Sequence, residues 1–253
     1  ISHIYSRIIT MQNLGEQIYE GKAKILYRTP DPRVILVKYK DAATAFNAQK
    51  QGKIERKGEL NCQITHHLFD FLGAKGIPHH FIRQTAPDQM EVVATQIIPI
   101  EVVVRNIAAG SLCKRLGIAQ GTILKRPIVE FYYKDDALGD PLINEEHVEL
   151  LALATPSQVA RLKQLALEIN HHLQSFMYRA GLDLVDFKLE FGLDHNQEIL
   201  LADEISPDTC RLWDIHETDP TRKILDKDRF RFDLGGVAES YLEVHSRILA
   251  QGF

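Results

Sequence analysis

The chain has 253 residues, of which 45% are hydrophobic and 25% are charged, and its formal net charge is −4. This length fits one large domain or two lobes with a substantial core. Because the charge is small and balanced, we expect no bulk attraction to nucleic acid or to a membrane. The sequence contains no run of about 18 apolar residues that would predict a transmembrane helix.

The cysteines and the first residues bear on the cellular compartment of the protein. Cys62, Cys113 and Cys210 are far apart and form no CxxC motif. This argues against a disulfide framework or a thiolate metal site and favours reduced thiols in a cytoplasmic protein. Residues 1–10 begin without methionine and are followed by Met11. They are too short and too polar for a signal peptide, so we interpret them as a leader, from an upstream start site or from an expression vector.

The N-terminal third has the pattern of strands. Residues 19–27 alternate in polarity, turn residues follow, and residues 34–39 are β-branched and apolar, which together predict a hairpin. Apolar residues then recur at helical spacing. Two β-branched runs follow, separated by Pro99. Because proline does not fit a central strand, we place the crossing between two lobes there. The predicted lobes are a β-rich lobe over 11–97 and an α+β lobe over 98–253.

The most regular predicted helix begins after Thr155. Thr155, Pro156 and Gln158 form a capping box with proline at the first helical position. The apolar positions repeat at helical spacing to Met177, and Gly181 suits the C-terminal end. Strands are predicted on both sides of this helix without a regular strand–helix alternation. The predicted fold class is therefore α+β rather than a doubly wound sheet.

The segment LVDFKLEFGLDHNQEILLADE predicts a hairpin that carries many charges. Asp186, Lys188 and Glu190 alternate with apolar residues and therefore share one face. The apolar residues predicted on the opposite face are Val185, Phe187, Leu189 and Phe191. If the loop is symmetric about residues 196–197, Glu190 lies directly opposite Asp203. Opposed side chains have Cβ atoms about 4.5–5.5 Å apart, so two carboxylates there need a raised pKa or a bound cation. Such oxygen ligands suit Mg²⁺; the alternative is a solvated hairpin neutralised by Lys188.

Two lysines near the N-terminus form a second candidate group. Lys22 and Lys24 are two positions apart, so a single strand would place both on one face with Glu20. Gly21 has no Cβ and allows a ligand to approach the backbone. Such lysines can bind phosphates as point charges, although lysines on an edge strand also prevent unwanted pairing. The sequence has no GxxxxGK[ST] or GxGxxG motif, so a nucleotide would have to be held in another way.

A third group has the character of an anion site. Arg105 ends an apolar run, and Ser111 opens a short helix after several small residues. A helix N-terminus, a hydroxyl and an arginine together suit a phosphate, although Ser111 can also be a simple cap. The turn at Pro207 and Asp208 brings Arg211 close behind the acidic hairpin. No serine or cysteine nucleophile motif is present, so phosphoryl chemistry is favoured.

Several segments in matching order, from Gln17 to Ile248, resemble the phosphoribosylaminoimidazole-succinocarboxamide synthase (SAICAR synthetase) family. They are YEGKAKILY, KDAATAFN, KGELN, PIEVVVRNIAAGSLCKRLGI, FYYKDDALGDPLI, LVDFKLEFG, LADEISPDTCRLWD and LDKDRFRFDLGG. The resemblance implies a two-lobed α+β fold related to ATP-grasp, with antiparallel sheets, flanking helices and ATP in the cleft between the lobes. It also implies a ligase of purine biosynthesis. This enzyme joins L-aspartate to 4-carboxy-5-aminoimidazole ribonucleotide through an acyl phosphate, with ATP and Mg²⁺, and releases ADP and phosphate.

The resemblance further implies roles for particular residues. Those that would contact ATP are Gly21, Lys22, Ala23, Lys24, Lys134, Glu190 and Asp203, and the last two would hold Mg²⁺. Those that would contact the ribonucleotide are Arg105, Ser111, Asp186, Lys188, Arg211, Arg229 and Arg231. Of these, Arg105, Ser111 and Arg211 would bind the 5′-phosphate. Asp186 and Lys188 would face the reacting end and are the catalytic candidates. The adenine would lie against residues 95–98, and the N-terminal lobe would be the ATP-binding lobe.

The resemblance also suggests a cytoplasmic homodimer that binds only small-molecule substrates. One departure concerns Val92, Val93 and Ala94, which stand where many bacterial members have lysines, so no nucleotide-binding lysine is assigned there. We expect residues 41–57 to close over the site. Two alternative functions are a small-molecule kinase, which would share the Asp-x-Lys strand, and a nucleotide-binding regulatory module without catalysis. Formation of ADP that requires both aspartate and the ribonucleotide would distinguish the three.

Overall fold

The computed structural model describes residues 14–45 and 49–252. Its first sheet is built from β1 (Gln17–Glu20), β2 (Lys24–Arg28), β3 (Val34–Tyr39), β6 (Phe81–Ala86) and β7 (Gln89–Val93). The second is built from β8 (Gln96–Ile97), β9 (Ile100–Ile107), β10 (Ile123–Tyr133), β11 (Leu142–Ile143), β12 (Leu182–Leu193), β13 (Ile199–Ala202) and β14 (Cys210–Asp214). A separate hairpin consists of β4 (Ala42–Ala45) and β5 (Lys50–Lys53). The helices are α1 (Lys57–Ala74), α2 (Ser111–Leu116), α3 (Glu145–Leu150), α4 (Pro156–Arg179), α5 (Asp228–Arg231) and α6 (Val237–Leu249).

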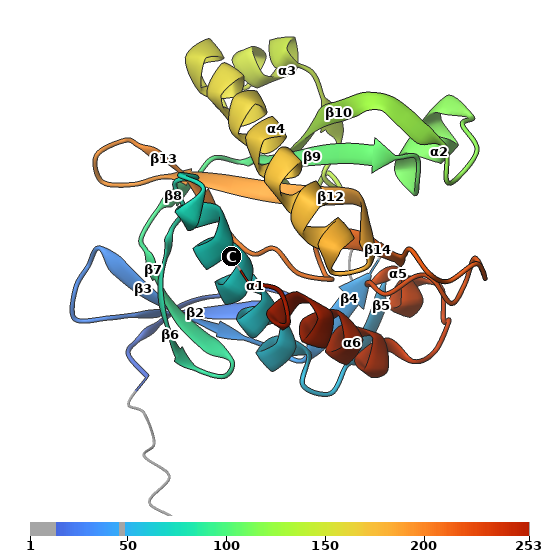
Figure 1. The fold of residues 1–253 in the computed structure, drawn as a ribbon. Helices are drawn as coiled ribbons and strands as arrows, with labels where there is room; N and C mark the ends of the chain where they lie inside the picture. Colours follow the sequence, from blue (N-terminus) through green and yellow to red (C-terminus); the bar gives the residue numbers. More distant parts are fainter. Residues whose placement is uncertain (1–13, 46–48, 253) are drawn as a thin grey trace, which may run out of the picture.

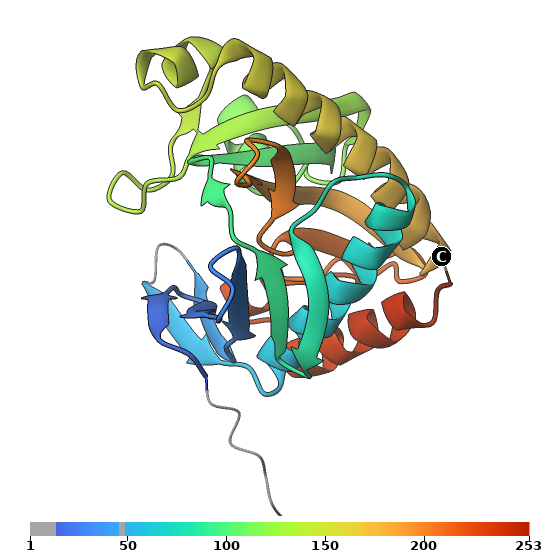
Figure 2. The ribbon, with the colours of Figure 1, turned by 90° about the vertical axis from the view of Figure 1, so that its left-hand side faces the viewer.

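Both sheets are antiparallel, and helices pack on their faces (Figures 1 and 2). The strand order is β1-β2-β3-β7-β6 in the first sheet and β11-β10-β9-β12-β13 in the second, where β8 and β14 also pair with β12. Helix α1 contacts the first sheet, and α4 contacts β9, β10 and β12 of the second. This arrangement confirms the α+β fold class with antiparallel sheets and flanking helices.

The N-terminal strand prediction was wrong in one respect. Residues 19–27 do not form one strand but belong to β1 and β2, which pair as a hairpin with Glu20 opposite Ile25. The turn forms at Gly21, whose N–H donates to the carbonyl of Lys24 at 2.8 Å, and Ala23 accepts from the N–H of Lys40 at 2.8 Å. Lys22 therefore lies in the turn and Lys24 on a strand, so the two lysines do not share a strand face. The predicted hairpin between 19–27 and 34–39 is present as β2 and β3.

The predicted long helix is confirmed as α4. Thr155 Oγ1 accepts the N–H of Gln158 at 3.2 Å, and Gln158 Oε1 accepts the N–H of Thr155 at 2.8 Å, which is the predicted capping box. Gly181 follows the helix with a φ of +75°, a conformation that glycine adopts without strain. The helical spacing predicted between the N-terminal hairpin and the two β-branched runs corresponds to α1.

The register of the β12–β13 hairpin differs by one residue from the predicted one. Glu190 lies opposite Ala202, not opposite Asp203. The reason is the loop over 194–198, which is held by Asp194 Oδ1. This atom accepts the N–H of Asn196 at 2.8 Å and that of Glu198 at 2.9 Å. The loop is thus asymmetric, and Asp203 follows the end of β13.

The predicted alternation along β12 also breaks at its N-terminal end. The pairing of β12 with β14 shifts between Leu184 and Asp186. Val185 consequently packs with Ala109 and Trp213 in a separate small cluster, whereas Phe187 belongs to the main core. A bulge of this kind cannot be read from polarity alone, because Val185 is buried in either arrangement.

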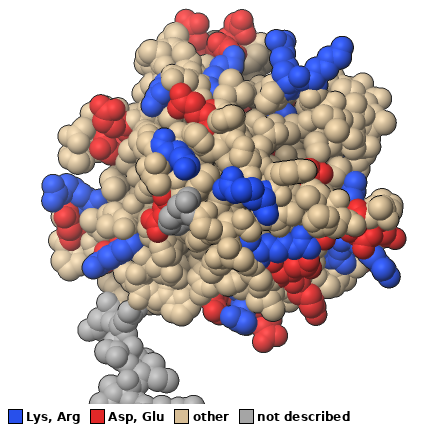
Figure 3. Space-filling view, viewed as in Figure 1, with Lys and Arg blue, Asp and Glu red and all other residues tan. Residues whose placement is uncertain are grey.

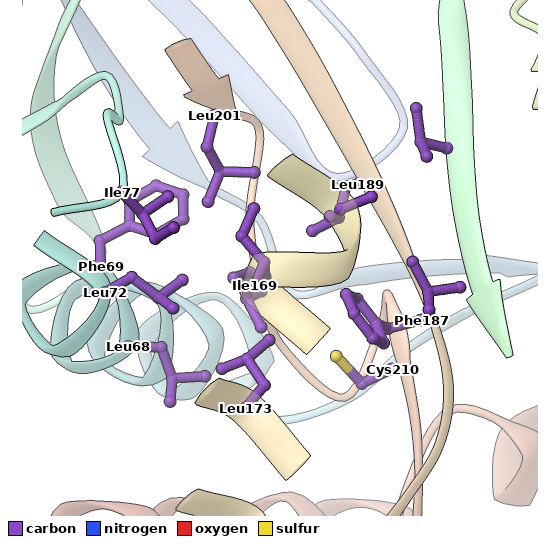
Figure 4. Packing of buried hydrophobic residues seen from close by; sticks show 14 of the residues in the cluster. Leu68, Phe69, Leu72, Ile77, Ile169, Leu173, Phe187, Leu189, Leu201 and Cys210 are labelled. Atoms are coloured by element: carbon purple, nitrogen blue, oxygen red, sulfur yellow. The ribbon is translucent and has the colours of Figure 1, made fainter. Parts of the chain in front are cut away.

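One main hydrophobic core joins the two sheets. Figure 4 shows Leu68 and Leu72 of α1 facing Ile169 and Leu173 of α4, with Phe187 of β12 beside them. All five side chains are almost completely buried. The core therefore lies between the helices and the long central strand, and it fixes the position of β12.

Further contacts connect the N-terminal and C-terminal parts of the chain. The N–H of His80 donates to the carbonyl of Leu201 at 2.9 Å, and the N–H of Leu201 donates to the carbonyl of Pro78 at 2.9 Å. Helix α6 packs alongside α1 (Figures 1 and 2). Pro99 lies between β8 and β9, which both belong to the second sheet. The chain therefore passes from the first sheet to the second earlier than predicted, between β7 and β8. The division of the chain at 97 and 98 stays a prediction.

Other expectations concern the surface and the cysteines. Cys62, Cys113 and Cys210 are free thiols. None of the helices in the described residues has the length and apolar character needed to cross a bilayer. Figure 3 shows acidic and basic side chains interspersed on one face of the molecule. The predicted leader over 1–10 and residues 46–48 of the segment expected to close over the site lie outside the described residues.

Candidate functional site

The centre of the candidate site is β12, which pairs with strands on both edges. Asp186 of β12 lies opposite Arg105 of β9 on one edge and opposite Arg211 of β14 on the other. Its Oδ2 accepts hydrogen bonds from Nη1 of Arg105 at 2.7 Å and from Nη1 of Arg211 at 2.9 Å. The sheet thus brings two arginines and a carboxylate together from three separate segments of the chain.

Arg105 is buried, and each of its three guanidinium nitrogens donates at least one hydrogen bond. Nε donates to Glu130 at 2.7 Å, and Nη2 donates to Ser111 Oγ and to Tyr132 Oη, each at 3.1 Å. Burial acts to lower the pKa of Arg105, but Asp186 and Glu130 outweigh burial and raise it. The structure brings Arg105 and Ser111 together as predicted. The Ser111 side chain contacts the arginine and does not cap α2.

Arg211 is held by two carboxylates and by the backbone next to it. Its Nε donates to Asp228 Oδ2 at 2.7 Å, and Asp228 Oδ1 accepts from Arg231 Nη1 at 2.5 Å. Burial acts to lower the pKa of Arg211, but Asp186 and Asp228 outweigh it, so the pKa is raised. Gly110 passes so close that a Cβ there would lie 2.6 Å from Nη2 of Arg211. The glycine therefore makes room for the guanidinium.

A group of lysines and carboxylates continues along the same face of β12. Lys188 Nζ lies 2.5 Å from Glu190 Oε1, 3.1 Å from Glu101 Oε1 and 3.6 Å from Asp203 Oδ2. Lys134 Nζ contacts the same oxygen of Glu190 at 2.8 Å. Burial acts to lower the pKa of Lys188, but Glu190 and Asp203 outweigh it, so the pKa lies well above its ordinary value. Glu190 and Asp203 therefore meet at one lysine despite the shifted register.

The two N-terminal lysines reach this group from the first sheet. Lys24 Nζ donates to Asp203 Oδ1 and lies 3.0 Å from Glu204 Oε1. Burial acts to raise the pKa of Asp203, but Lys24 and Lys188 outweigh it, so the pKa lies below its ordinary value. Lys22 Nζ contacts Asp136 at 2.6 Å, on the loop between β10 and β11, which Figure 2 shows on the same side of the molecule as the N-terminal strands.

A cavity of about 330 Å³ opens beside the row of Arg105, Asp186 and Arg211. The basic side chains among its described lining residues are Lys22, Arg105, Lys188, Arg211, Lys227 and Arg231. The acidic ones are Glu101, Asp140, Asp186 and Asp208. Basic side chains outnumber acidic ones in this lining, so the cavity suits an anionic ligand.

Arg229 and Arg231 were both expected to contact the ribonucleotide, but the structure places them differently. Arg231 lines the cavity, whereas Arg229 does not. The guanidinium of Arg229 instead donates to backbone carbonyls at 2.7–3.2 Å, those of Gly235, Thr221, Ile224 and Leu234. Arg229 thus holds the chain around α5 together, and the structure does not bring it to the other predicted ligand-binding residues.

Some residues of the site were missed by the sequence reasoning. Glu101 could have been found, because Glu101 and Arg105 alternate with the buried Val102 and Val104 along β9 and so share a face. Lys227 could not have been found in this way. It precedes the four-residue helix α5, whose sequence has no periodic pattern that indicates which side chains face a cavity.

Comparisons with known proteins agree with the resemblance in the motifs. The family model for SAICAR synthetase matches residues 17–248. The phosphoribosylaminoimidazole-succinocarboxamide synthase of Acaryochloris marina (strain MBIC 11017) is 61% identical over 237 residues, which cover 94% of this chain and 97% of that protein. The crystal structure of the phosphoribosylaminoimidazole-succinocarboxamide synthase from Ehrlichia chaffeensis is 47% identical, has a TM-score of 0.89, and aligns over 94% of this chain and 100% of its own.

A structure of SAICAR synthetase (Type-2) in complex with ADP is 44% identical to this chain, with a TM-score of 0.87, and aligns over 93% of this chain and 98% of its own. The family match extends over both sheets and over every segment that carried the resemblance. We conclude that the chain belongs to the SAICAR synthetase family.

Proposed function

We propose that the chain is an ATP-dependent ligase that joins L-aspartate to 4-carboxy-5-aminoimidazole ribonucleotide, with ADP and phosphate as the other products. Membership of the family and the likeness to a structure in complex with ADP support this function. The observation that carries it is the arrangement along β12. An arginine-lined cavity for an anion continues into a group of lysines and carboxylates suited to nucleotide phosphates.

The cavity also lacks an activated thiol nucleophile. Cys210 lines it, but burial raises the pKa of this thiol to about 12, so the thiol stays protonated at neutral pH. Chemistry that relies on positioning and charge neutralisation, as phosphoryl transfer does, fits such a site better than covalent catalysis by cysteine.

The reaction would then proceed in two transfers. An oxygen of the substrate carboxylate attacks the γ-phosphorus of ATP, and the bond to the β-phosphate oxygen breaks to release ADP. The aspartate amine attacks the carbonyl carbon of the acyl phosphate, the amine loses a proton, and phosphate leaves. Lys188, which stays protonated, would neutralise the carboxylate during both steps. Asp186, held between Arg105 and Arg211, would orient the imidazole end.

We assign the ATP phosphates to the turn that contains Gly21, Lys22 and Ala23, together with Lys24 and Lys134. Lys22 lies in this turn and Lys24 follows it on β2, and both contact carboxylates from the C-terminal part of the chain. The adenine would lie against residues 95–98. The ribonucleotide's 5′-phosphate is assigned to Arg105, Ser111 and Arg211, with Arg231 nearby; Arg229 is left out of this set because it does not line the cavity.

Mg²⁺ would be held by Glu190 and Asp203. Both are carboxylates, they contact the same Lys188 ammonium, and Mg²⁺ prefers oxygen ligands. Among the described residues no three His, Cys, Asp or Glu side chains gather in a metal-binding group. The other ligands would therefore be phosphate oxygens and water, as is common for Mg²⁺. The bound ion would neutralise phosphate charge, and Lys24 and Lys134 would be released to contact the phosphates.

We further propose that the protein is a cytoplasmic homodimer. The free thiols of Cys62, Cys113 and Cys210 are consistent with a reducing compartment. The dimer follows from the resemblance to family members.

The function is tested by measuring ADP release from Mg-ATP and the carboxylated ribonucleotide, with and without L-aspartate. We expect release to require both. Glu190→Gln and Asp203→Asn should each lower kcat by at least about 100-fold, because each removes charge that acts on the phosphates. Glu198→Gln, an exposed carboxylate on the same hairpin, is the matched control and should leave kcat unchanged. Release without aspartate would indicate a kinase or a hydrolase instead, and full activity of both site variants would contradict the proposed metal ligands.

A further inference from the structure

Asp208 lines the cavity, and both of its oxygens already have hydrogen-bond donors. Its side chain is 4% exposed. Oδ2 accepts from Nζ of Lys57 at 2.7 Å, and Oδ1 accepts from the hydroxyl of Tyr241 at 2.7 Å. Lys57 belongs to α1 and Tyr241 to α6, and both are completely buried or nearly so. Two helices thus supply hydrogen-bond donors to this carboxylate from residues that do not line the cavity.

Lys227 stands beside Asp208 but is not hydrogen-bonded to it. Its Nζ lies 3.8 Å from Asp208 Oδ2, which is too far for a hydrogen bond, and the side chain is only 16% exposed. No other acceptor within hydrogen-bond distance of this ammonium is found in the described part of the chain. Burial lowers the pKa of Lys227, and Arg231 and Lys57 add to this effect, while Asp208 opposes it. Because the Lys227 side chain is mostly buried and lines the cavity, its ammonium can donate to a ligand that is bound there.

The other basic side chains of the cavity differ from Lys227 in this respect. Arg105 and Arg211 each donate to Asp186. Lys188 donates to Glu190, and Lys22 donates to Asp136 on the neighbouring loop. Their charges are therefore already partly neutralised within the protein.

Arg231 is intermediate between these residues and Lys227. Its Nη1 donates to Asp228, and no acceptor for its other N–H groups is found among the described side chains. A guanidinium has five N–H donors, so most of those of Arg231 remain available. Lys227 and Arg231 lie four positions apart around α5 and line the same cavity. They form a pair of cations with unused donors.

We propose that Lys227, assisted by Arg231, binds a side-chain or α-carboxylate of the dicarboxylic amino acid that the enzyme joins to its ribonucleotide. This inference rests on the proposed function. That substrate brings two carboxylates, which need cations that protein carboxylates do not already neutralise. Its amine must also reach the carboxylate held near Lys188, and Lys188 lines the same cavity as Lys227. Lys57 and Tyr241 act as positioning residues, because they satisfy Asp208 and so leave Lys227 for the ligand.

The test compares Lys227→Met and Lys227→Gln with the unaltered enzyme in steady-state assays, varying one substrate at a time. We expect the KM for L-aspartate to rise by about 10- to 100-fold, as for loss of a charge-assisted hydrogen bond. The KM values for ATP and the ribonucleotide should stay within about twofold. Lys227→Arg, which keeps the charge, should recover part of the loss. Lys223→Met is the matched control, because Lys223 lies over the Trp213 ring and does not line the cavity.

A binding measurement with succinate provides a readout that does not depend on turnover. Succinate has both carboxylates of aspartate and no amine, so it should inhibit competitively against aspartate, and its inhibition constant should rise in the Lys227 variants in parallel with the KM. A selective rise in the KM for the ribonucleotide would overturn the assignment, and so would unchanged constants in both neutral variants. Lack of aspartate-dependent turnover in the unaltered enzyme would instead contradict the proposed function itself.

Discussion

Gly110 shows how a single missing side chain positions the site. Its φ is +55° and its ψ is −126°, a conformation reserved largely for glycine, and a Cβ there would lie 2.6 Å from Nη2 and 2.9 Å from Cζ of Arg211. The backbone thus forms one wall against which the guanidinium rests. This wall, together with Asp186 and Asp228, fixes the direction of the side chain.

We therefore expect Gly110→Ala to displace Arg211. The KM for the ribonucleotide should rise by about tenfold or more, and the free energy of unfolding should fall by about 1–3 kcal/mol from backbone strain. Gly117→Ala is the control: Gly117 also has a positive φ, +65°, but a Cβ there would meet nothing within 4 Å. The Gly117→Ala variant should have a lower free energy of unfolding but an unchanged KM for the ribonucleotide. Equal KM values in both variants, measured alongside urea unfolding, would show that Arg211 does not bind this substrate.

At the scale of elements, the sequence predicts faces better than registers. The period of two along β12 correctly placed Asp186, Lys188 and Glu190 together, because strand geometry alone fixes that relation. The register between β12 and β13 was wrong by one residue, because it depends on how Asp194 folds the loop. Glu190 and Asp203 nevertheless meet at Lys188, which reaches both.

Contacts between distant helices and the cavity had no signal in the sequence. Asp208 was recognised only as a turn residue, yet it accepts from Lys57 of α1 and from Tyr241 of α6. A single charged residue at a helix start and a tyrosine on an apolar helix face are both ordinary features. Their common partner becomes visible only when tertiary packing brings the three segments together.

Helix α6 is expected to influence substrate binding through Tyr241. Tyr241→Phe keeps the shape of the side chain but removes the donor to Asp208 Oδ1, a buried carboxylate. The free energy of unfolding should fall by about 1–3 kcal/mol. Asp208 should then draw Lys227, now 3.8 Å away, out of the cavity, so the KM for L-aspartate should rise. Tyr178→Phe, at an exposed tyrosine on α4, should change neither quantity. Lower stability with an unchanged KM would mean that Lys227 does not respond to Asp208.

At the scale of the whole molecule, the sequence suggested two lobes, and the structure shows how closely the two sheets are joined. Leu201 of β13 exchanges backbone hydrogen bonds with Pro78 and His80, which lie more than 100 residues earlier in the chain. The main core contains residues from both sheets, such as Met90 and Val92 of β7 and Phe187 of β12. Polarity patterns describe each segment alone, so they cannot reveal that segments this far apart share one core.

Because the core is shared, we expect the chain to unfold in one cooperative transition. Trp213, the single tryptophan, lies in the second sheet, so its fluorescence reports on that part alone, whereas far-UV circular dichroism reports on both. The two urea midpoints should coincide. Leu68→Ala in α1, where the side chain is 0% exposed, should lower the free energy of unfolding by about 2–5 kcal/mol and shift both midpoints together. Leu150→Ala, at a side chain 79% exposed, should shift neither. If Leu68→Ala moved only the dichroism signal and left Trp213 fluorescence unchanged, the two sheets would unfold independently, and the lobes would be separate folding units.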